Sequence, residues 1–481
     1  MSSSPLSRSD EASWHEKIRR RELYRCLFNL AHLAENIQIT EDFASKTPPK
    51  LAILISVTAE LLLQSILIKA PEQDLEQINT MLGIITPHLR YVERARVAQT
   101  PWSLIKSAEE LLKLASNSKN HFIIRPTWAY NYSIIGEFVS FYRELLSCWA
   151  WFPLDEWKAR LTELGLNVDE AIYCISFPRI ERENCLLHAN WGHEVGHILV
   201  AKWVNDDFGI VWATDEPGIK SRIEDHVKQN IPPVDPLFKD LVIQEAVANQ
   251  MRATMEVASQ GLVELLCDRI GAHILGPSAL AATLEFAARF AIDVSPLQSS
   301  NYPPWRYRLR MLLQHCTPDL NDDKEMGYPN TELRAFIEWL RTGQRLTETK
   351  TDIRNIESNV ITKEAYIFIT AHMDEAIKKV TSMLPVELSL PYRLHEHRIN
   401  IAKLVDRLRQ GIPPNEICHL SDSPASFQDI LSAAWAFKMD KIAKNSSWGS
   451  PDEYNLLFRL VLKGCECSYI HSDWKKRDKG E

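Results

Sequence analysis

Two histidines and a glutamate near the middle of the chain have the spacing of a metal-dependent hydrolytic site. Residues 193 to 197 read His-Glu-Val-Gly-His. On a helix, residues four apart lie about 40° apart around the axis and roughly 6 Å apart along it, so the imidazoles of His193 and His197 can reach one ion. Imidazole nitrogen is a good zinc ligand, and the carboxylate of Glu194 can deprotonate a water in an open coordination position. The motif therefore predicts a zinc-dependent hydrolase.

The sequence around the motif favours a single helix that carries both histidines. The segment from Glu183 to Val204 is rich in apolar residues and contains no proline. Proline would remove a backbone donor and clash with the preceding turn, so its absence allows an uninterrupted helix. We expect this helix to be half buried in a core, with the ligands on one face.

A catalytic zinc ion needs a third protein ligand, which must come from elsewhere in the chain. Glu264 and Asp268 are four residues apart in a helical pattern, with leucines and an isoleucine covering the opposite face. This spacing lets Glu264 bind zinc while Asp268 accepts a hydrogen bond from the far nitrogen of a ligand histidine and so fixes its tautomer. Glu245, followed by Asn249, is an alternative third ligand, and either glutamate can also simply face solvent.

Peptide hydrolysis also needs a donor for the oxyanion that develops on the carbonyl. Tyr302, Arg306 and Arg308 are candidates, because a proline-rich loop followed by closely spaced arginines can project into a cleft. The arginines can alternatively pair with surface acids. We take Tyr302 and Arg306 as the predicted donors.

These residues make the chain resemble the gluzincin metallopeptidases, in which a His-Glu-x-x-His helix is followed by a helix carrying Glu-x-x-x-Asp. The resemblance implies that His193, His197 and Glu264 are the zinc ligands. It further implies that Glu194 is the general base and that Asp268 orients a ligand. The later run from residue 271 to residue 277 is similar, more loosely, to the continuation found in ImmA/IrrE-type cytosolic proteases.

The resemblance covers about residues 171 to 316 and has clear departures. Metzincins are excluded, because Val200 and Trp203 stand where that branch has Gly and a third His. The 66 residues between His197 and Glu264 exceed the spacing in compact gluzincins. Val263 stands where those enzymes have an Asn before the Glu.

Length and periodicity predict an α+β protein that is predominantly helical. The 481 residues are too many for one compact core. We expect a helical domain at 1–165, a zincin-like metallopeptidase domain with a small sheet at 166–320, and a helical domain at 321–481. Within the middle domain, residues 171–177 read as a strand, which either presents an open edge to a peptide or lies inside a sheet. Residues 205–240, punctuated by glycines and prolines, read as a long loop or lid.

The composition bears on partners and on location. The formal net charge of −8 gives no general attraction for a phosphate backbone, so we expect no nucleic acid partner. The most apolar window, residues 51 to 68, is interrupted by Glu60 and Gln64 and favours a buried helix over a membrane span. Nine dispersed cysteines and a polar N-terminus without a signal peptide favour the cytoplasm. Residues 1–5 and 475–481 are expected to be disordered, and the oligomeric state is left open.

The sequence thus predicts a cytoplasmic zinc peptidase, most simply an endopeptidase, that acts on a protein or peptide through a zinc-bound water activated by Glu194. The alternative is a helical regulatory or interaction protein with a structural or inactive zinc site. An open fourth coordination position favours the enzyme, and a sealed site or a fourth protein ligand favours the alternative.

Overall fold

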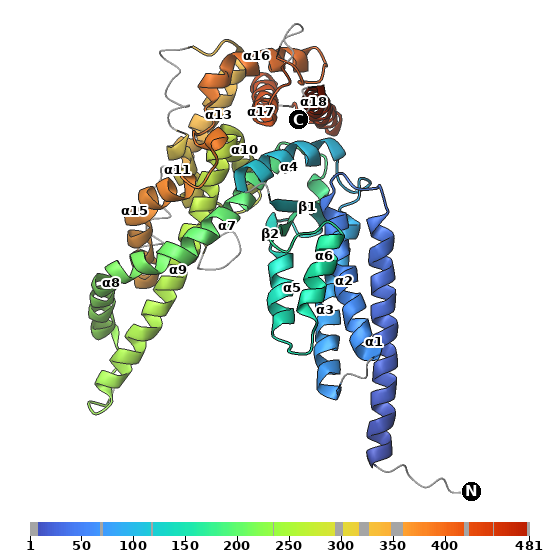
Figure 1. Cartoon of the computed structure of the whole chain (residues 1–481). Helices are drawn as coiled ribbons and strands as arrows, with labels where there is room; N and C mark the ends of the chain where they lie inside the picture. Colours follow the sequence, from blue (N-terminus) through green and yellow to red (C-terminus); the bar gives the residue numbers. More distant parts are fainter. Residues whose placement is uncertain are drawn as a thin grey trace. The chain divides into compact units, whose positions relative to one another are not determined.

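The structure is a computed structural model that describes residues 8–67, 71–116, 119–233, 235–293, 302–316, 327–347, 359–417, 423–445 and 447–478. It is mostly helical, as expected, and its described residues include one small mixed sheet (Figure 1). The chain forms two compact units: unit 1 comprises Met1–Glu109 and Asn117–Arg182, and unit 2 comprises Glu110–Ser116 and Glu183–Glu481. The boundaries expected at 165 and 320 stay predictions.

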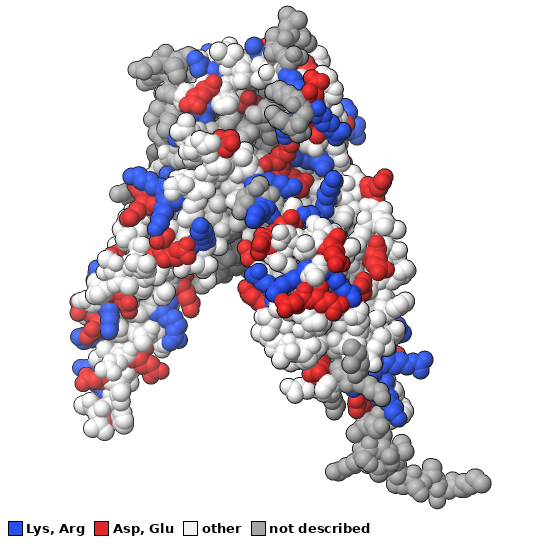
Figure 2. All heavy atoms as spheres, viewed as in Figure 1, with Lys and Arg blue, Asp and Glu red and all other residues white. Residues whose placement is uncertain are grey.

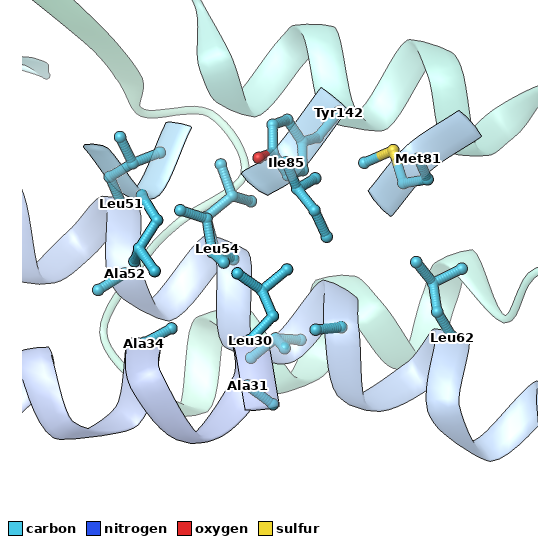
Figure 3. Packing of buried hydrophobic residues seen from close by; sticks show 14 of the residues in the cluster. Leu30, Ala31, Ala34, Leu51, Ala52, Leu54, Leu62, Met81, Ile85 and Tyr142 are labelled. Atoms are coloured by element: carbon cyan, nitrogen blue, oxygen red, sulfur yellow. The ribbon is translucent and has the colours of Figure 1, made fainter. Parts of the chain in front are cut away.

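Unit 1 is built on long helices that bury an aliphatic core. They are α1 (Arg8–Gln38), α2 (Thr47–Leu67), α3 (Glu72–Arg94), the first turns of α4 (Trp102–Ser116), α5 (Phe138–Ser147) and α6 (Leu154–Glu163). Side chains of α1, α2, α3 and α5 meet in this core, as the sticks of Leu30, Leu54, Ile85 and Tyr142 illustrate (Figure 3). Burial of such apolar surface is the main driving force for folding of this unit.

Helix α2 is the apolar window singled out from the sequence. It is the one helix among the described residues that is long and apolar enough to cross a membrane, by length and composition alone. In the structure, 61% of that window is buried against the rest of the protein. Its leucines and alanines belong to the core of unit 1, in agreement with a buried helix.

The sheet of unit 1 contains β1 (Asn120–Thr127), β2 (Ser133–Ile135) and β3 (Ala171–Pro178). The strand predicted at 171–177 is therefore confirmed. It lies in the middle of the sheet, parallel to β1 and antiparallel to β2, so it presents no open edge for a peptide. The purely helical character expected for residues 1–165 is wrong at β1 and β2. The buried run from Phe122 to Ile124 fits a strand because it pairs with β3 and packs on both faces.

In unit 2, α7 (Trp191–Trp203) carries the motif. One π-helical turn (Val204–Phe208) connects it to α8 (Gly209–Asn230), and α9 (Lys239–Leu275) follows. The loop or lid expected at 205–240 is therefore wrong for most of its length. Pro217 lies inside α8, where buried Trp212, Ile219 and Ile223 hold the helix in place despite the missing hydrogen bond. Charged side chains of both signs are mixed along α8 and α9, and the tip that joins them is largely uncharged (Figure 2).

The remaining helices of unit 2 lie between residues 277 and 478. They are α10 (Pro277–Ala287), α11 (Trp305–His315), α13 (Thr331–Thr347), α15 (Val360–Thr381), α16 (Leu394–Arg409), α17 (Phe427–Lys444) and α18 (Pro451–Asp478). The disorder expected from residue 475 is contradicted as far as Asp478, because α18 continues to that residue. Residues 1–5 and 479–481 lie outside the described residues.

The zincin-like core expected at 166–320 is not confirmed. The sheet belongs to unit 1, whereas α7 and α9 belong to unit 2. The coarser expectation, a mainly helical protein with a small sheet, is confirmed.

Candidate metal centre

The candidate metal centre depends on the close packing of α7 against α9 (Figure 1). Glycines make this approach possible. A Cβ added at Gly196 would lie 2.8 Å from the Cα of Cys267, and one added at Gly271 would lie 3.0 Å from the backbone nitrogen of His193. Because no Cβ separates the two backbones, side chains one turn away on each helix can converge. Gly192 and Gly196, four apart, are a sequence signal for this contact that the motif analysis did not use.

Three potential ligands converge where the helices pack. Ligand atoms of His193, His197 and Glu264 all lie within 4.8 Å of one another. The Nε2 of His193 is 3.5 Å from Oε2 of Glu264, and the Nε2 of His197 is 3.8 Å from its Oε1. The imidazole rings stand nearly perpendicular, with centroids 4.9 Å apart. The three side chains predicted as ligands therefore form a group that could hold a metal ion.

Asp268 lies where it can orient one of these histidines. Its Oδ1 is 2.8 Å from Nδ1 of His193. An aspartate bound at Nδ1 leaves Nε2, the nitrogen that faces Glu264, to act as the ligand atom. Glu264 and Asp268, one turn apart on α9, thus contact opposite nitrogens of the same ring.

Arg308 of α11 completes this cluster and is its main electrostatic feature. Its Nε and Nη2 donate to the two carboxylate oxygens of Asp268 at 2.7 and 2.6 Å, and its Nη1 is 3.0 Å from Oε2 of Glu264. Burial alone would raise the pKa of Asp268, but the charge of Arg308 and hydrogen bonds from His193 and Arg308 hold that pKa far below its usual value. One guanidinium therefore contacts both Glu264 and Asp268, and it holds Asp268 in its ionised form.

The histidines differ in their tendency to protonate. Burial, together with the positive charges of His193 and Arg308, lowers the pKa of His197 to about 3, which keeps this ring neutral. For His193, burial alone would lower the pKa, but the hydrogen bond and charge of Asp268 raise it overall. Neutral imidazole is the form that binds a metal, so His197 is ready to coordinate, whereas the raised pKa of His193 makes protonation and metal binding compete at that ring.

Glu194 follows the first ligand and is buried, with 4% of its surface exposed. This burial and the charge of Glu264 raise its pKa to about 7, against opposing effects from His193 and Arg308. A carboxylate with a pKa near neutrality can both take up and release a proton at the operating pH. This is the property required of a general base that later acts as an acid.

The remaining predicted residues lie in different surroundings. Tyr302 is partly buried, and that burial together with the charge of Glu264 raises its pKa, so it lies within electrostatic range of the group. Arg306 instead binds Asp293 through Nε at 2.6 Å and donates to the carbonyl oxygen of Leu346, so these contacts give no support to its role as oxyanion donor. Glu245, the alternative ligand, is exposed on α9.

The ligand group is accessible on one side. The side chain of His197 is 27% exposed, whereas those of His193 and Glu264 are 15% and 10% exposed. Solvent or a substrate atom can therefore approach from the His197 side. No family model, no curated protein and no solved structure matches the chain.

Proposed function

We propose that the protein is a zinc-dependent peptidase in which His193, His197 and Glu264 bind the ion and Glu194 is the general base. The observation that carries this proposal is the convergence of the three ligand atoms within 4.8 Å. In addition, Nδ1 of His193, the ring nitrogen that does not face Glu264, contacts Asp268. An unrelated cluster of side chains would not be expected to combine ligands and an orienting carboxylate in this way.

The donor set supports zinc as the ion. Two imidazole nitrogens and one carboxylate oxygen are a catalytic zinc set, which leaves one coordination position for water. The exposure of His197 supports an open position. When bound, zinc would polarise a water molecule and a carbonyl oxygen at this position.

The protein's own residues then have distinct tasks. Glu194 would accept a proton from the attacking water and deliver it to the nitrogen of the leaving amine. Asp268 and Arg308 would keep His193 and Glu264 in place during this exchange. Tyr302 is proposed as the donor to the oxyanion, because a neutral phenol with a raised pKa can donate a hydrogen bond without losing its proton. A protein or peptide substrate and a cytoplasmic location complete the proposal.

Zinc binding is the first test. The purified protein should bind about one zinc ion, measured by elemental analysis and by calorimetric titration after chelation. The variant Glu264→Gln should bind zinc at least about tenfold more weakly. Glu245→Gln is the matched control, because it removes an exposed glutamate from the same helix, and it should bind as wild type does. Equal affinity in Glu264→Gln and Glu245→Gln would show that the third ligand is assigned wrongly.

Peptide cleavage is the second test. The wild type should cleave members of a peptide library, and a chelator should stop the cleavage, since the ion is removed. Glu194→Gln should still bind zinc but lose activity by at least a hundredfold, because its amide cannot accept a proton. Cleavage by Glu194→Gln at the wild-type rate would refute the proposed base. Bound zinc without cleavage by the wild type would support the structural or inactive site instead.

A further inference from the structure

A second polar cluster in unit 2 carries an excess of positive charge. It comprises Arg269 and His273 of α9, His315 at the end of α11, and Arg393, which precedes α16. We call these four residues the cationic cluster. None of them belongs to the candidate metal centre, although Arg269 directly follows Asp268 in the sequence.

Backbone and ring contacts bring the members of the cationic cluster together. The rings of His273 and His315 are nearly parallel, with centroids 6.5 Å apart. Nη1 of Arg393 donates to the carbonyl oxygen of His315 at 3.2 Å. The backbone nitrogen of Tyr392 donates to the carbonyl oxygen of His273 at 2.8 Å, which ties this segment to the end of α9. Three separate parts of the chain therefore hold the cluster in one place.

Within the part of the chain that the structure describes, two buried nitrogens of the cluster have no hydrogen-bond partner. They are Nε of Arg269 and Nε2 of His315. Among the described residues, no carboxylate forms an ion pair with Arg269, and the carboxylate whose charge raises its pKa is that of Asp374, which is exposed on α15. A buried guanidinium nitrogen without a hydrogen-bond partner is unfavourable unless something else satisfies it.

The positive charges within the cluster repel one another. Burial lowers the pKa of Arg269, and the positive charge of Arg393 lowers it further. Burial also lowers the pKa of His315 to about 3, with contributions from Arg269, Arg393 and His273. The cluster therefore combines the guanidinium of Arg269, which forms no ion pair within the described residues, with the neutral imidazole of His315, an arrangement that an anion would stabilise.

We propose that the cationic cluster is a binding site for a small oxyanion of the phosphate class. Guanidinium groups present several N–H donors in a plane that matches a phosphate, and an imidazole N–H can donate a further hydrogen bond. The unpartnered Nε of Arg269 and Nε2 of His315 supply two of these donors. His273 cannot offer its Nε2, because that atom contacts the carbonyl oxygen of Leu388 at 2.9 Å.

Titration of the full-length protein with inorganic phosphate tests this proposal. At constant ionic strength, phosphate should raise the midpoint of thermal unfolding in a saturable way, and calorimetry should give a single site. Acetate at the same ionic strength should have a clearly smaller effect, since it offers fewer acceptor oxygens. No phosphate effect beyond that of chloride would overturn the proposal, and an equal response to acetate would overturn the choice of phosphate.

Two variants locate the site. Arg269→Met should weaken phosphate binding at least tenfold and, in chloride buffer, should unfold at the same or a higher temperature, because it removes an unpaired buried charge. Arg160→Met, which removes an arginine paired with Glu60 and Glu156 in unit 1, should keep the phosphate response. Unchanged phosphate affinity in Arg269→Met would refute the assignment.

Two further variants separate this site from the metal centre and from a folding defect. Phosphate can also coordinate zinc, so His193→Ala, which leaves the cationic cluster intact, should retain the wild-type phosphate affinity. His315→Gln keeps both arginines and should weaken phosphate binding several-fold. Loss of phosphate binding in His193→Ala would place the anion at the metal centre and overturn the proposal.

Discussion

Asp268 and Arg269 are neighbours on α9, yet the charge of Asp268 is paired and that of Arg269 is not, among the residues that the structure describes. The carboxylate of Asp268 is fully matched, since it is held by His193 and by two nitrogens of Arg308. The guanidinium of Arg269 forms no ion pair within the described part of the chain, and its Nε has no hydrogen-bond partner. Because a helix turns by about 100° per residue, adjacent side chains enter different surroundings. A matched buried charge organises a site, whereas an unmatched one marks a position that a group of opposite charge would stabilise.

The largest expected effect comes from breaking the matched side of this comparison. Arg308→Met should destabilise the metal-free protein by about 3–5 kcal/mol, because the buried carboxylates of Glu264 and Asp268 would lose their common partner. Urea unfolding followed by tryptophan fluorescence measures this loss. Zinc should restore part of the stability, since the ion compensates Glu264.

Two comparisons control this prediction. Arg308→Lys restores a positive charge without the planar fork, so its stability should lie between those of the wild type and Arg308→Met. Arg269→Met removes an arginine from the unmatched side and should cost nothing in phosphate-free buffer. Equal destabilisation by Arg308→Met and Arg269→Met would contradict the distinction between matched and unmatched charges.

The ligand group could be predicted from the sequence because its geometry is local. His193 and His197 lie four apart on one helix, and Glu264 and Asp268 repeat that spacing on another, so helical periodicity alone places each pair on one face. Only the pairing of the two helices is non-local. The glycines at 192 and 196 indicate it, since a helix without Cβ atoms on one stripe accepts a close neighbour.

Features that depend on tertiary packing were missed for a physical reason. Pro217 and Gly218 indicate a loop by their local preferences, but α8 persists because its buried face and the ion pair between Arg222 and Glu364 stabilise it. The strand β1 was missed because its identity depends on pairing with β3, some fifty residues away. Likewise, three arginines at 306, 308 and 310 look equivalent in sequence, and only the fold selects Arg308 for the acids of α9.

The next largest loss of stability is expected when the close contact between α7 and α9 is disturbed. Gly196→Ala adds a methyl group 2.8 Å from the backbone of Cys267, so the helices must move apart. Such overpacking costs about 1–3 kcal/mol, and the displacement should also weaken zinc binding, because Glu264 moves away from the histidines. Gly83→Ala is the matched control, since no atom lies within 4 Å of the added methyl group, and it should be neutral or slightly stabilising. Wild-type zinc affinity in Gly196→Ala would show that the close approach does not position the ligands.

His88 of unit 1 extends the comparison to a partly buried titratable group that stays neutral at pH 7. Its Nδ1 lies 2.9 Å from the hydroxyl of Tyr142, and aromatic rings surround it. Burial lowers its pKa from 6.5 to about 4. The unfolded state therefore binds the proton first as the pH falls, so the stability that neutral His88 contributes is complete above about pH 6.5 and is lost as the pH falls towards 4.

This titration should cost the wild type about 2 kcal/mol between pH 7 and pH 5, because each pKa unit corresponds to about 1.4 kcal/mol. His88→Gln keeps a hydrogen-bonding partner for Tyr142 but does not titrate. Between pH 7 and pH 5, the free energy of unfolding of this variant should therefore fall by about 2 kcal/mol less than that of the wild type. Urea unfolding of both proteins at the two pH values isolates the contribution of His88, since all other groups are shared. Parallel pH profiles would mean that His88 is hydrated enough to protonate in place. The three sites thus differ in how burial and charge are combined. The charge of Asp268 is paired, that of Arg269 is unpaired within the described residues, and His88 stays neutral.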